Sequence, residues 1–116
     1  MKIENCIFCN IVEGKQPADI VYETERVIAF KDIRPKAPIH ILVIPKEHIA
    51  TLNDITVKHQ NLIGEIFLVV KDLAKQFGLA EKGYRTVFNC NRDAGQDVYH
   101  IHLHILGGRK LFWPPG

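Results

Sequence analysis

Three histidines near the end of the chain alternate with apolar residues, in the segment His100-Ile101-His102-Leu103-His104-Ile105-Leu106. In a β-strand successive side chains point to opposite faces, so the three imidazoles would share one face and the apolar residues the other. Residues two apart on a strand lie roughly 6.5–7 Å from each other, which lets neighbouring imidazoles converge on one ligand group. This segment is therefore the first candidate for a reactive site.

Three interpretations fit a strand with a histidine face. The first is a half-buried strand that is merely polar on one side, which three histidines at strict alternation disfavour. The second is a metal site, because His-x-His on a strand can place two nitrogens on one ion, as in zinc hydrolases. The third is covalent catalysis, in which a neutral imidazole attacks phosphorus while its neighbours donate hydrogen bonds to the phosphoryl oxygens. Spacing alone leaves the last two open.

Two cysteines near the start, Cys6 and Cys9, form a second candidate group. The spacing Cys-x-x-Cys is a half-site for zinc, but a buried pair in one helix turn has the same spacing. Cys90 lacks a partner nearby in the sequence and is predicted to be a packing residue at a strand end. Three cysteines in a chain without a secretion signal argue against a disulfide framework.

The apolar pattern predicts the elements that must position these groups. Apolar residues every three or four positions predict a short N-terminal helix and a long amphipathic helix, the latter with Asp54 or Thr56 as N-cap and Gly78 as its end. Runs rich in β-branched residues between turn signals predict strands. Strands on either side of one long helix indicate an α+β fold. The predicted helices are Ile7–Glu13 and Val57–Phe77, and the predicted strands are Ile20–Glu23, Val27–Lys31, His40–Pro45, Tyr84–Asn89 and Val98–Leu106.

The polar, glycine-bearing segment 89–97 is predicted to be a loop between the last two strands. Its backbone N–H groups would be available to phosphoryl oxygens bound beside the histidines.

Size and composition predict an ordinary globular protein. The chain has 116 residues, enough for one domain with its own core, and its formal net charge is +2. This charge predicts neither a nucleic-acid partner nor a membrane partner. No basic leader or long apolar run is present, so a cytoplasmic location is expected.

The segment His100–Leu106 resembles the signature of the histidine triad (HIT) superfamily, His-φ-His-φ-His-φ-φ, where φ is apolar. Further segments, spread over nearly the whole chain, are similar to its histidine triad nucleotide-binding (Hint) branch: Phe30–Ile33, Ala37–His40, Ile44–Lys46, Gly95-Gln96, Val98-Tyr99 and Trp113–Gly116. The resemblance implies a HIT-like fold, with an antiparallel sheet of about five strands, one long helix and a short N-terminal helix. It also implies a single HIT domain over residues 1–116.

Members of that branch hydrolyse purine nucleoside phosphoramidates, such as AMP joined to an amine, and release the nucleoside 5′-monophosphate. The resemblance makes His102 the nucleophile that carries a covalent nucleotidyl intermediate, with no catalytic cofactor. His104 would stabilise charge on the phosphate. His100 would hold the surroundings of the nucleophile or, as in some relatives, bind zinc, and His40 would pack behind the triad.

The same resemblance assigns a nucleotide site. Asp32 would bind the ribose hydroxyls and Asn89 would lie on the phosphate side, while Gly95, Gln96 and Asp97 would line it from the polar segment. Asp97 departs from animal members, which have a serine that contacts the scissile phosphate or protonates the amine. An inward carboxylate would repel phosphate, so the role of that serine is not carried over, and Asp97 would instead attract a cationic amine. The apolar base pocket would consist of Ile7, Phe8, Ile11, Ile33 and Leu42.

Two further features follow from the resemblance. Cys6, Cys9, His48 and His100 would form a closed Cys2His2 site for a structural zinc ion. The chain would form a homodimer, in which the apolar C-terminal tail reaches the partner's active site and Trp113 shapes the leaving-group pocket there.

Three other functions remain as alternatives. A dinucleoside polyphosphate hydrolase would use the same nucleophile on a phosphoanhydride, although the terminal Trp113–Gly116 favours the Hint branch. A nucleotide-binding or scaffold protein would keep the pocket with little turnover. A catalytic zinc hydrolase is disfavoured because the sequence offers no obvious carboxylate base beside the triad.

Overall fold

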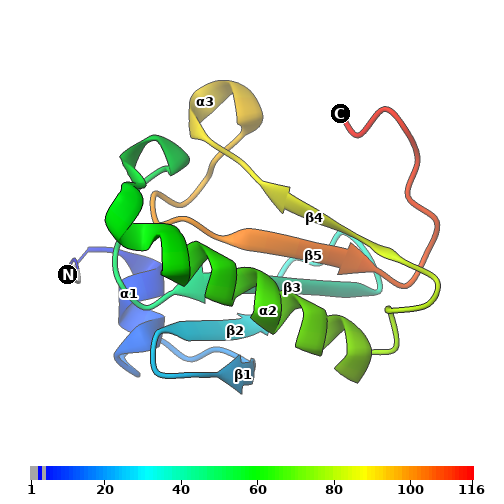
Figure 1. Ribbon diagram of the computed structural model, residues 1–116, viewed down its shortest axis with the longest axis horizontal. Helices are drawn as coiled ribbons and strands as arrows, with labels where there is room; N and C mark the ends of the chain where they lie inside the picture. The colour runs from blue at the N-terminus through cyan, green and yellow to red at the C-terminus, as the bar shows by residue number, and fades with distance from the viewer. Residues whose placement is uncertain (1–2, 4) are drawn as a thin grey trace.

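One antiparallel sheet of five strands organises the computed structural model, which describes residue 3 and residues 5–116 (Figure 1). The strands lie in the order β1-β2-β3-β5-β4. Together with one long helix and a short N-terminal helix, this sheet confirms the predicted α+β fold class. The strands are β1 (Ile20–Glu23), β2 (Val27–Lys31), β3 (Ile39–Pro45), β4 (Tyr84–Phe88) and β5 (Leu103–Gly107).

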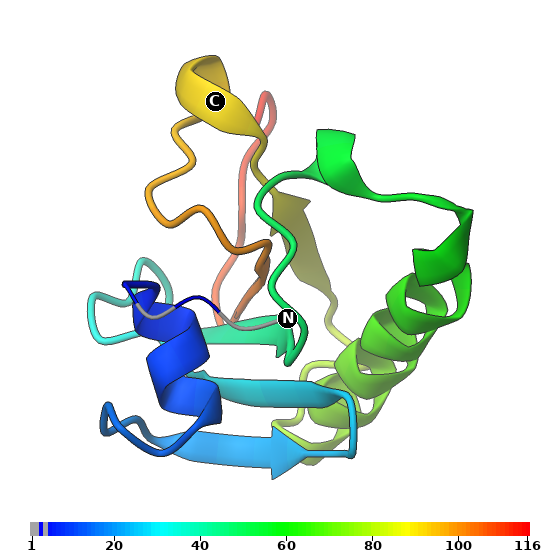
Figure 2. The ribbon, with the colours of Figure 1, turned by 90° about the vertical axis from the view of Figure 1, so that its left-hand side faces the viewer.

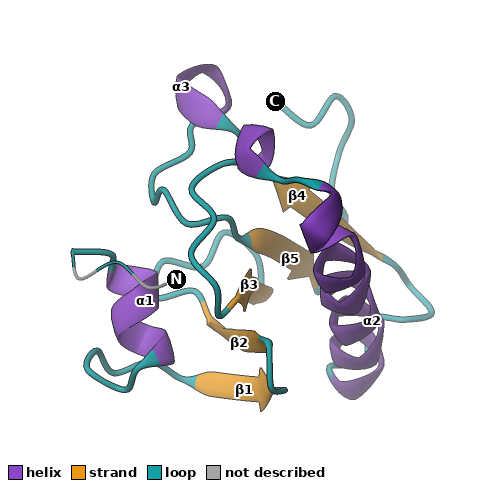
Figure 3. Ribbon diagram, turned by 60° about the vertical axis from the view of Figure 1, so that its left-hand side comes forward, coloured by secondary structure: helices purple, strands orange, loops and turns teal. Residues whose placement is uncertain are grey.

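The two main helices cover opposite faces of this sheet, α1 (Ile7–Val12) on one side and α2 (Gln60–Gln76) on the other (Figures 2 and 3). Side chains alternate between the faces, so Ile41 and Val43 of β3 pack in the cluster under α2. Leu42, between them, packs in the cluster under α1. The same alternation places His40 and His104 on the α1 face, because their neighbours along the strands point to α2.

The long helix begins three residues later than predicted. Residues Val57–His59 form a 3₁₀ turn, and α2 proper starts at Gln60. Thr56 caps this 3₁₀ turn by accepting from the Lys58 N–H, so the predicted cap holds the helical segment even though the first turn is not α-helical. Asp54 instead closes a capping box with Thr51 in an earlier turn. Among the described residues, no helix is long and apolar enough to span a bilayer.

The prediction of a strand over Val98–Leu106 is wrong in its first half, because β5 begins only at Leu103. Residue Leu103 pairs with Val43 on one side and with Phe88 on the other. Continued toward Ile101, the same register would place Pro45 of β3 opposite it, but Pro45 has no N–H to donate. The Ile101 N–H donates to the Ile49 carbonyl instead. The alternation of faces nevertheless continues through this irregular stretch, since Ile101 packs in the α2 cluster with Leu103.

The segment 89–97 is also more ordered than the predicted loop. It contains the one-turn helix α3 (Asn91–Ala94), which ends at Gly95 in the left-handed conformation with φ +79°. The buried Gln96 secures the segment, because its side-chain oxygen accepts from the Asn91 N–H and its amide donates to the Ala50 and Val98 carbonyls. The N–H groups of Asn91, Gly95 and Gln96 are therefore already engaged within the chain.

Candidate active site

His102 lies just before β5, with its ring held in one tautomer. Its Nδ1 is 2.8 Å from the His100 carbonyl oxygen. A carbonyl oxygen only accepts, so Nδ1 carries the proton and the neutral ring has its lone pair on Nε2. The Phe8 ring from α1 packs edge-on against this imidazole, with 5.1 Å between centroids. The contact and the hydrogen bond together hold the Nε2 lone pair in a defined direction.

His104 is held by a chain of hydrogen bonds that runs through His40. The Lys36 N–H donates to His40 Nδ1 at 3.0 Å, so the neutral His40 ring carries its proton on Nε2. His40 Nε2 lies 2.9 Å from His104 Nδ1, and donation along this contact leaves the His104 proton on Nε2. No buried side-chain nitrogen or oxygen among the described residues lacks a partner, so the unbonded His104 Nε2 must reach solvent. A donor thus stands beside the His102 imidazole, with 5.0 Å between the His102 and His104 rings.

Burial keeps the two imidazole rings of this hydrogen-bond chain, His40 and His104, neutral. It lowers the pKa of His104 from 6.5 to about 4, helped by the adjacent His102 and His40 and opposed by the carboxylates of Asp32 and Asp97. Burial likewise lowers the pKa of His40, against the attraction of Asp32. The donor arrangement described above is therefore the form present at neutral pH.

A pH dependence of stability follows from His104. Between pH 6.5 and about 4 the unfolded chain binds a proton at this residue that the folded chain does not. The contribution to stability is complete above pH 6.5, and the free energy of unfolding is expected to fall as the pH falls through this window. Urea unfolding of the wild type and of His104→Asn at pH 7 and pH 5 measures the effect. Equal pH dependence in both proteins would contradict it, since all other groups are shared.

Two carboxylates lie beside the histidines, Asp32 and Asp97, both of which the family resemblance assigned to the nucleotide site. Asp32 Oδ2 is 3.4 Å from His40 Nε2, and its other oxygen accepts from the Arg34 N–H at 2.8 Å. Asp97 Oδ1 is 3.4 Å from His102 Nε2. Both lie outside the strand of the triad, so strand periodicity does not reveal them, and only the resemblance predicted their place.

The residues predicted for a base pocket divide into two groups. Phe8, Ile11 and Leu42 are buried together between α1 and the sheet, where they form a packed wall beside His102. Ile7 and Ile33 stay exposed, Ile33 at 88%. Asn89 and Gly95 flank the α3 turn on the same loop as Asp97.

The C-terminal tail contacts its own chain only lightly at Trp113. Arg85 donates to the Phe112 carbonyl, and its guanidinium lies 5.9 Å from the Trp113 ring centroid. The indole remains 81% exposed, so most of its surface is available to another molecule.

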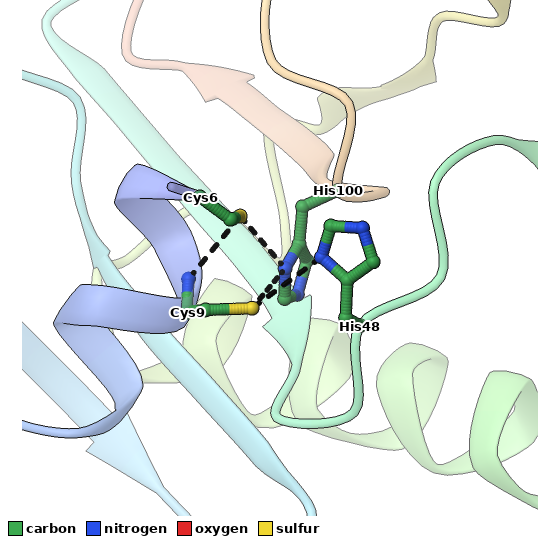
Figure 4. Close-up of side chains that lie close together, drawn as sticks. All are labelled: Cys6, Cys9, His48 and His100. Carbon is green, nitrogen blue, oxygen red and sulfur yellow. Dashed lines mark hydrogen bonds between the residues drawn. The ribbon is translucent and has the colours of Figure 1, made fainter. Parts of the chain in front are cut away.

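Four side chains of the types that can ligate metals, Cys6, Cys9, His48 and His100, converge at the N-terminal end of α1 (Figure 4). The Cys6 and Cys9 sulfurs lie 3.4 and 3.5 Å from His100 Nδ1, and the Cys9 sulfur lies 3.3 Å from His48 Nδ1. His100 Nε2 donates to the Pro45 carbonyl at 2.7 Å, which turns the Nδ1 lone pair toward both sulfurs. This cluster could hold a metal ion.

His100 is thus separated in function from the other two histidines of the motif. Its ring belongs to the cysteine cluster, whereas its backbone carbonyl orients His102. Complete burial lowers the pKa of His100 to about 4, with the Pro45 hydrogen bond opposing. Burial raises the pKa of the Cys9 thiol, so metal binding there would release a proton.

A second group of potential ligands, Asp32, His40 and His104, has a different geometry. Two nitrogens on one tetrahedral zinc ion are separated by roughly 3.3 Å, given Zn–N bonds of about 2.0–2.1 Å. The His40 and His104 nitrogens are only 2.9 Å apart, a hydrogen-bonding distance. The proton chain described above therefore accounts for this group.

Comparison with known proteins gives consistent relationships over almost the full length. A family model described as "Scavenger mRNA decapping enzyme C-term binding" matches residues 5–110. An uncharacterised HIT-like protein of Synechococcus elongatus is 55% identical over 113 residues, 97% of this chain and 98% of the relative. The purine nucleoside phosphoramidase of Escherichia coli K12 is 49% identical over 108 residues, 93% of this chain and 91% of the relative. The crystal structure of a HIT family hydrolase from Legionella pneumophila superposes with a TM-score of 0.95 at 54% identity, covering 97% of this chain and 100% of that one.

Proposed function

The chain belongs to the HIT family, and from that premise we propose that it is a hydrolase of the Hint branch that cleaves purine nucleoside phosphoramidates. The observation that carries the proposal is the tautomer of His102, whose lone pair on Nε2 is set beside the solvent-accessible N–H of His104. The phosphoramidase name of the Escherichia coli relative supports the choice of substrate.

The reaction proceeds in two steps on His102. Its Nε2 lone pair forms a bond to the α-phosphorus, the P–N bond breaks, and the leaving nitrogen takes its electron pair together with a proton from solvent. The positive charge that develops on the imidazole is stabilised by the Nδ1–H bond to the His100 carbonyl. Water then attacks phosphorus, loses a proton to solvent, and returns the electron pair of the N–P bond to His102, which releases AMP.

Binding groups surround this reaction centre. The free lone pairs of Asp32 accept the ribose hydroxyls, since one carboxylate has more acceptor sites than the Arg34 N–H occupies. The base lies against the wall of Phe8, Ile11 and Leu42. Asn89 contributes from the end of β4 on the phosphate side.

His104 donates from Nε2 to a phosphoryl oxygen as charge builds on it. His104→Ala is expected to lower kcat by about 10²–10³-fold, the usual effect of removing one such donor. His40→Ala, which removes the partner that sets the His104 tautomer, should give a smaller loss. Steady-state kinetics on an adenosine phosphoramidate measure both. If the His40 variant were impaired more than the His104 variant, the proposed order of donation, from His40 to His104 to the phosphoryl oxygen, would be wrong.

The substrate class is tested by assaying the purified protein with an adenosine phosphoramidate and with a diadenosine polyphosphate. AMP release with a higher kcat/KM for the phosphoramidate is the expected result. A preference for the polyphosphate would favour the dinucleoside polyphosphate hydrolase instead. AMP binding without turnover of either compound would favour a nucleotide-binding protein.

The cysteine and histidine cluster fits a structural zinc ion held by Cys6, Cys9, His48 and His100. With Zn–S bonds of about 2.3 Å and Zn–N bonds of about 2.0–2.1 Å, sulfur and nitrogen on one tetrahedral ion are roughly 3.5 Å apart. The separations in the cluster are 3.3–3.5 Å. Such an ion would stabilise the docking of α1 and take no part in the reaction.

A homodimer completes the proposal. β4 forms one edge of the sheet, and the Phe67 ring of α2 lies near the Phe88 ring of β4. Phe67 and the next residue of α2, Leu68, are both exposed. Pairing of β4 edges would bury this apolar surface, and the exposed Trp113 would reach the partner's leaving-group pocket.

Leu68→Glu is expected to shift the protein from dimer to monomer, because a charge would be buried in the interface. Sedimentation velocity measures the change. Ile20→Glu, at the opposite edge of the sheet, is the control and should remain dimeric. A Leu68→Glu dimer as stable as the wild type would contradict this choice of interface.

A further inference from the structure

A carboxylate stands directly in front of the proposed nucleophile. Asp97 Oδ1 lies 3.4 Å from His102 Nε2, and the Asp97 side chain is 80% exposed while that of His102 is only 3% exposed. The imidazole is thus almost fully enclosed, whereas the carboxylate beside its Nε2 faces solvent. A phosphate bonded to Nε2 would therefore lie within contact distance of the Asp97 carboxylate.

The backbone next to Asp97 is anchored by hydrogen bonds, but the Asp97 carboxylate is not. Gln96, the preceding residue, is buried and holds Asn91, Ala50 and Val98 through its side-chain amide. No lysine or arginine in the described part of the chain lies within ion-pair distance of Asp97. The side chain can therefore swing while its point of attachment stays beside the reaction centre.

The contact with His102 cannot be a simple attraction when the ring is neutral. Nε2 then presents a lone pair, and the carboxylate oxygen is also an acceptor, so no proton is available to join them. A negative charge here also repels an incoming phosphate. If the Asp97 charge favours substrate binding, it must do so by attracting another part of the substrate.

We propose that Asp97 selects substrates whose leaving amine carries an additional positive charge, an inference that rests on the phosphoramidase function proposed above. In an in-line attack the leaving nitrogen lies on the side of phosphorus opposite Nε2, toward solvent. The phosphate displaces the Asp97 carboxylate to that same side, where it meets the leaving group. A cationic amine gains from this charge, a neutral amine does not, and an anionic amine is repelled.

Three adenosine phosphoramidates of equal chain length provide the test. Their leaving groups are a linear diamine with a free ammonium end, an alkylamine, and an amino acid with a free carboxylate end. For the wild type, kcat/KM is expected to fall from the cationic to the neutral to the anionic probe, by about 2–5-fold at each step, the size of one exposed ion pair. Asp97→Asn should bring the three values together, and Asp97→Lys should reverse their order.

The three probes have to be compared by kcat/KM and not by kcat. All three probes form the same nucleotidyl-His102 intermediate, so a kcat limited by hydrolysis of that intermediate is common to them. The charge preference is expected in kcat/KM and should weaken at high ionic strength. Asp93→Asn is the matched control, since Asp93 is an exposed aspartate on the same segment that pairs with Arg92.

The outcomes separate the two proposals. If the wild type cleaves the neutral probe but Asp97→Asn keeps the wild-type ratio of cationic to anionic probe, the selection by Asp97 is wrong and the phosphoramidase function stands. If the wild type cleaves none of the three, the function itself is wrong and the inference fails with it. Circular dichroism and thermal unfolding of the variants verify that their folds are intact.

Discussion

Replacing His102 with alanine is expected to lower kcat/KM for hydrolysis of an adenosine phosphoramidate by about 10⁴–10⁶-fold, the range typical for loss of a nucleophile that works with its neighbours as a unit. The reason lies in the hydrogen bond from Nδ1 to the His100 carbonyl, which leaves Nε2 as the attacking atom. No other imidazole of the site presents a free lone pair in that position, since His104 Nδ1 accepts from His40.

Rapid acid quenching during turnover should trap one adenylyl group per wild-type chain, detectable by mass spectrometry and located on His102 by peptide mapping. His102→Ala should show none while retaining its folded structure by circular dichroism. His59→Asn is the control histidine, because His59 pairs with Glu47 at the start of α2 and should leave turnover unchanged. Turnover by His102→Ala above about a tenth of the wild-type rate would exclude this histidine as the nucleophile.

Loss of the cysteine cluster is expected to have the second largest effect, on stability and metal content. The wild type purified from zinc-containing medium should carry one zinc ion per chain, and Cys9→Ser should carry much less. Structural zinc sites contribute free energy directly to folding, and several kcal/mol corresponds to a fall in Tm of roughly 10 °C or more for a chain of this size. Elemental analysis and thermal unfolding measure the two quantities.

Cys90→Ser is the matched control, because Cys90 is a free, partly exposed cysteine outside the cluster. It should keep the zinc content and Tm of the wild type. A chelator should lower the Tm of the wild type and of Cys90→Ser, but hardly that of Cys9→Ser. Equal Tm values for all three proteins with and without chelator would contradict a structural zinc site.

The cysteine and histidine cluster is linked structurally to His102, so its loss is expected to affect catalysis as well as stability. Phe8, between the two cysteines in sequence, packs edge-on against His102, and His100 contributes its ring to the cluster and its carbonyl to His102. Loosening of α1 would therefore disturb the orientation of the His102 ring, the proposed nucleophile. The kcat of Cys9→Ser is expected to fall along with its Tm.

The fold class and the division of residues between the two faces could be predicted from the sequence. Alternation of apolar and polar side chains is a local property, so Ile101, Leu103 and Ile105 could be assigned to the core without knowing what they contact. The period of three to four residues likewise identified α2. The family signature places the candidate nucleophile at His102. The family resemblance also predicts the group Cys6, Cys9, His48 and His100, whose side chains the structure brings together.

The chemistry of the individual rings was decided only by the tertiary structure. Which nitrogen of an imidazole carries the proton depends on its hydrogen-bond partner, and for His104 that partner is His40, 64 residues away. The placement of Asp97 before His102 depends on how Gln96 anchors a loop that periodicity does not describe. The start of β5 depends on the end of β3, where Pro45 offers no N–H. Sequence periodicity determines which face a side chain takes, whereas protonation, charge proximity and strand length depend on partners that only folding brings together.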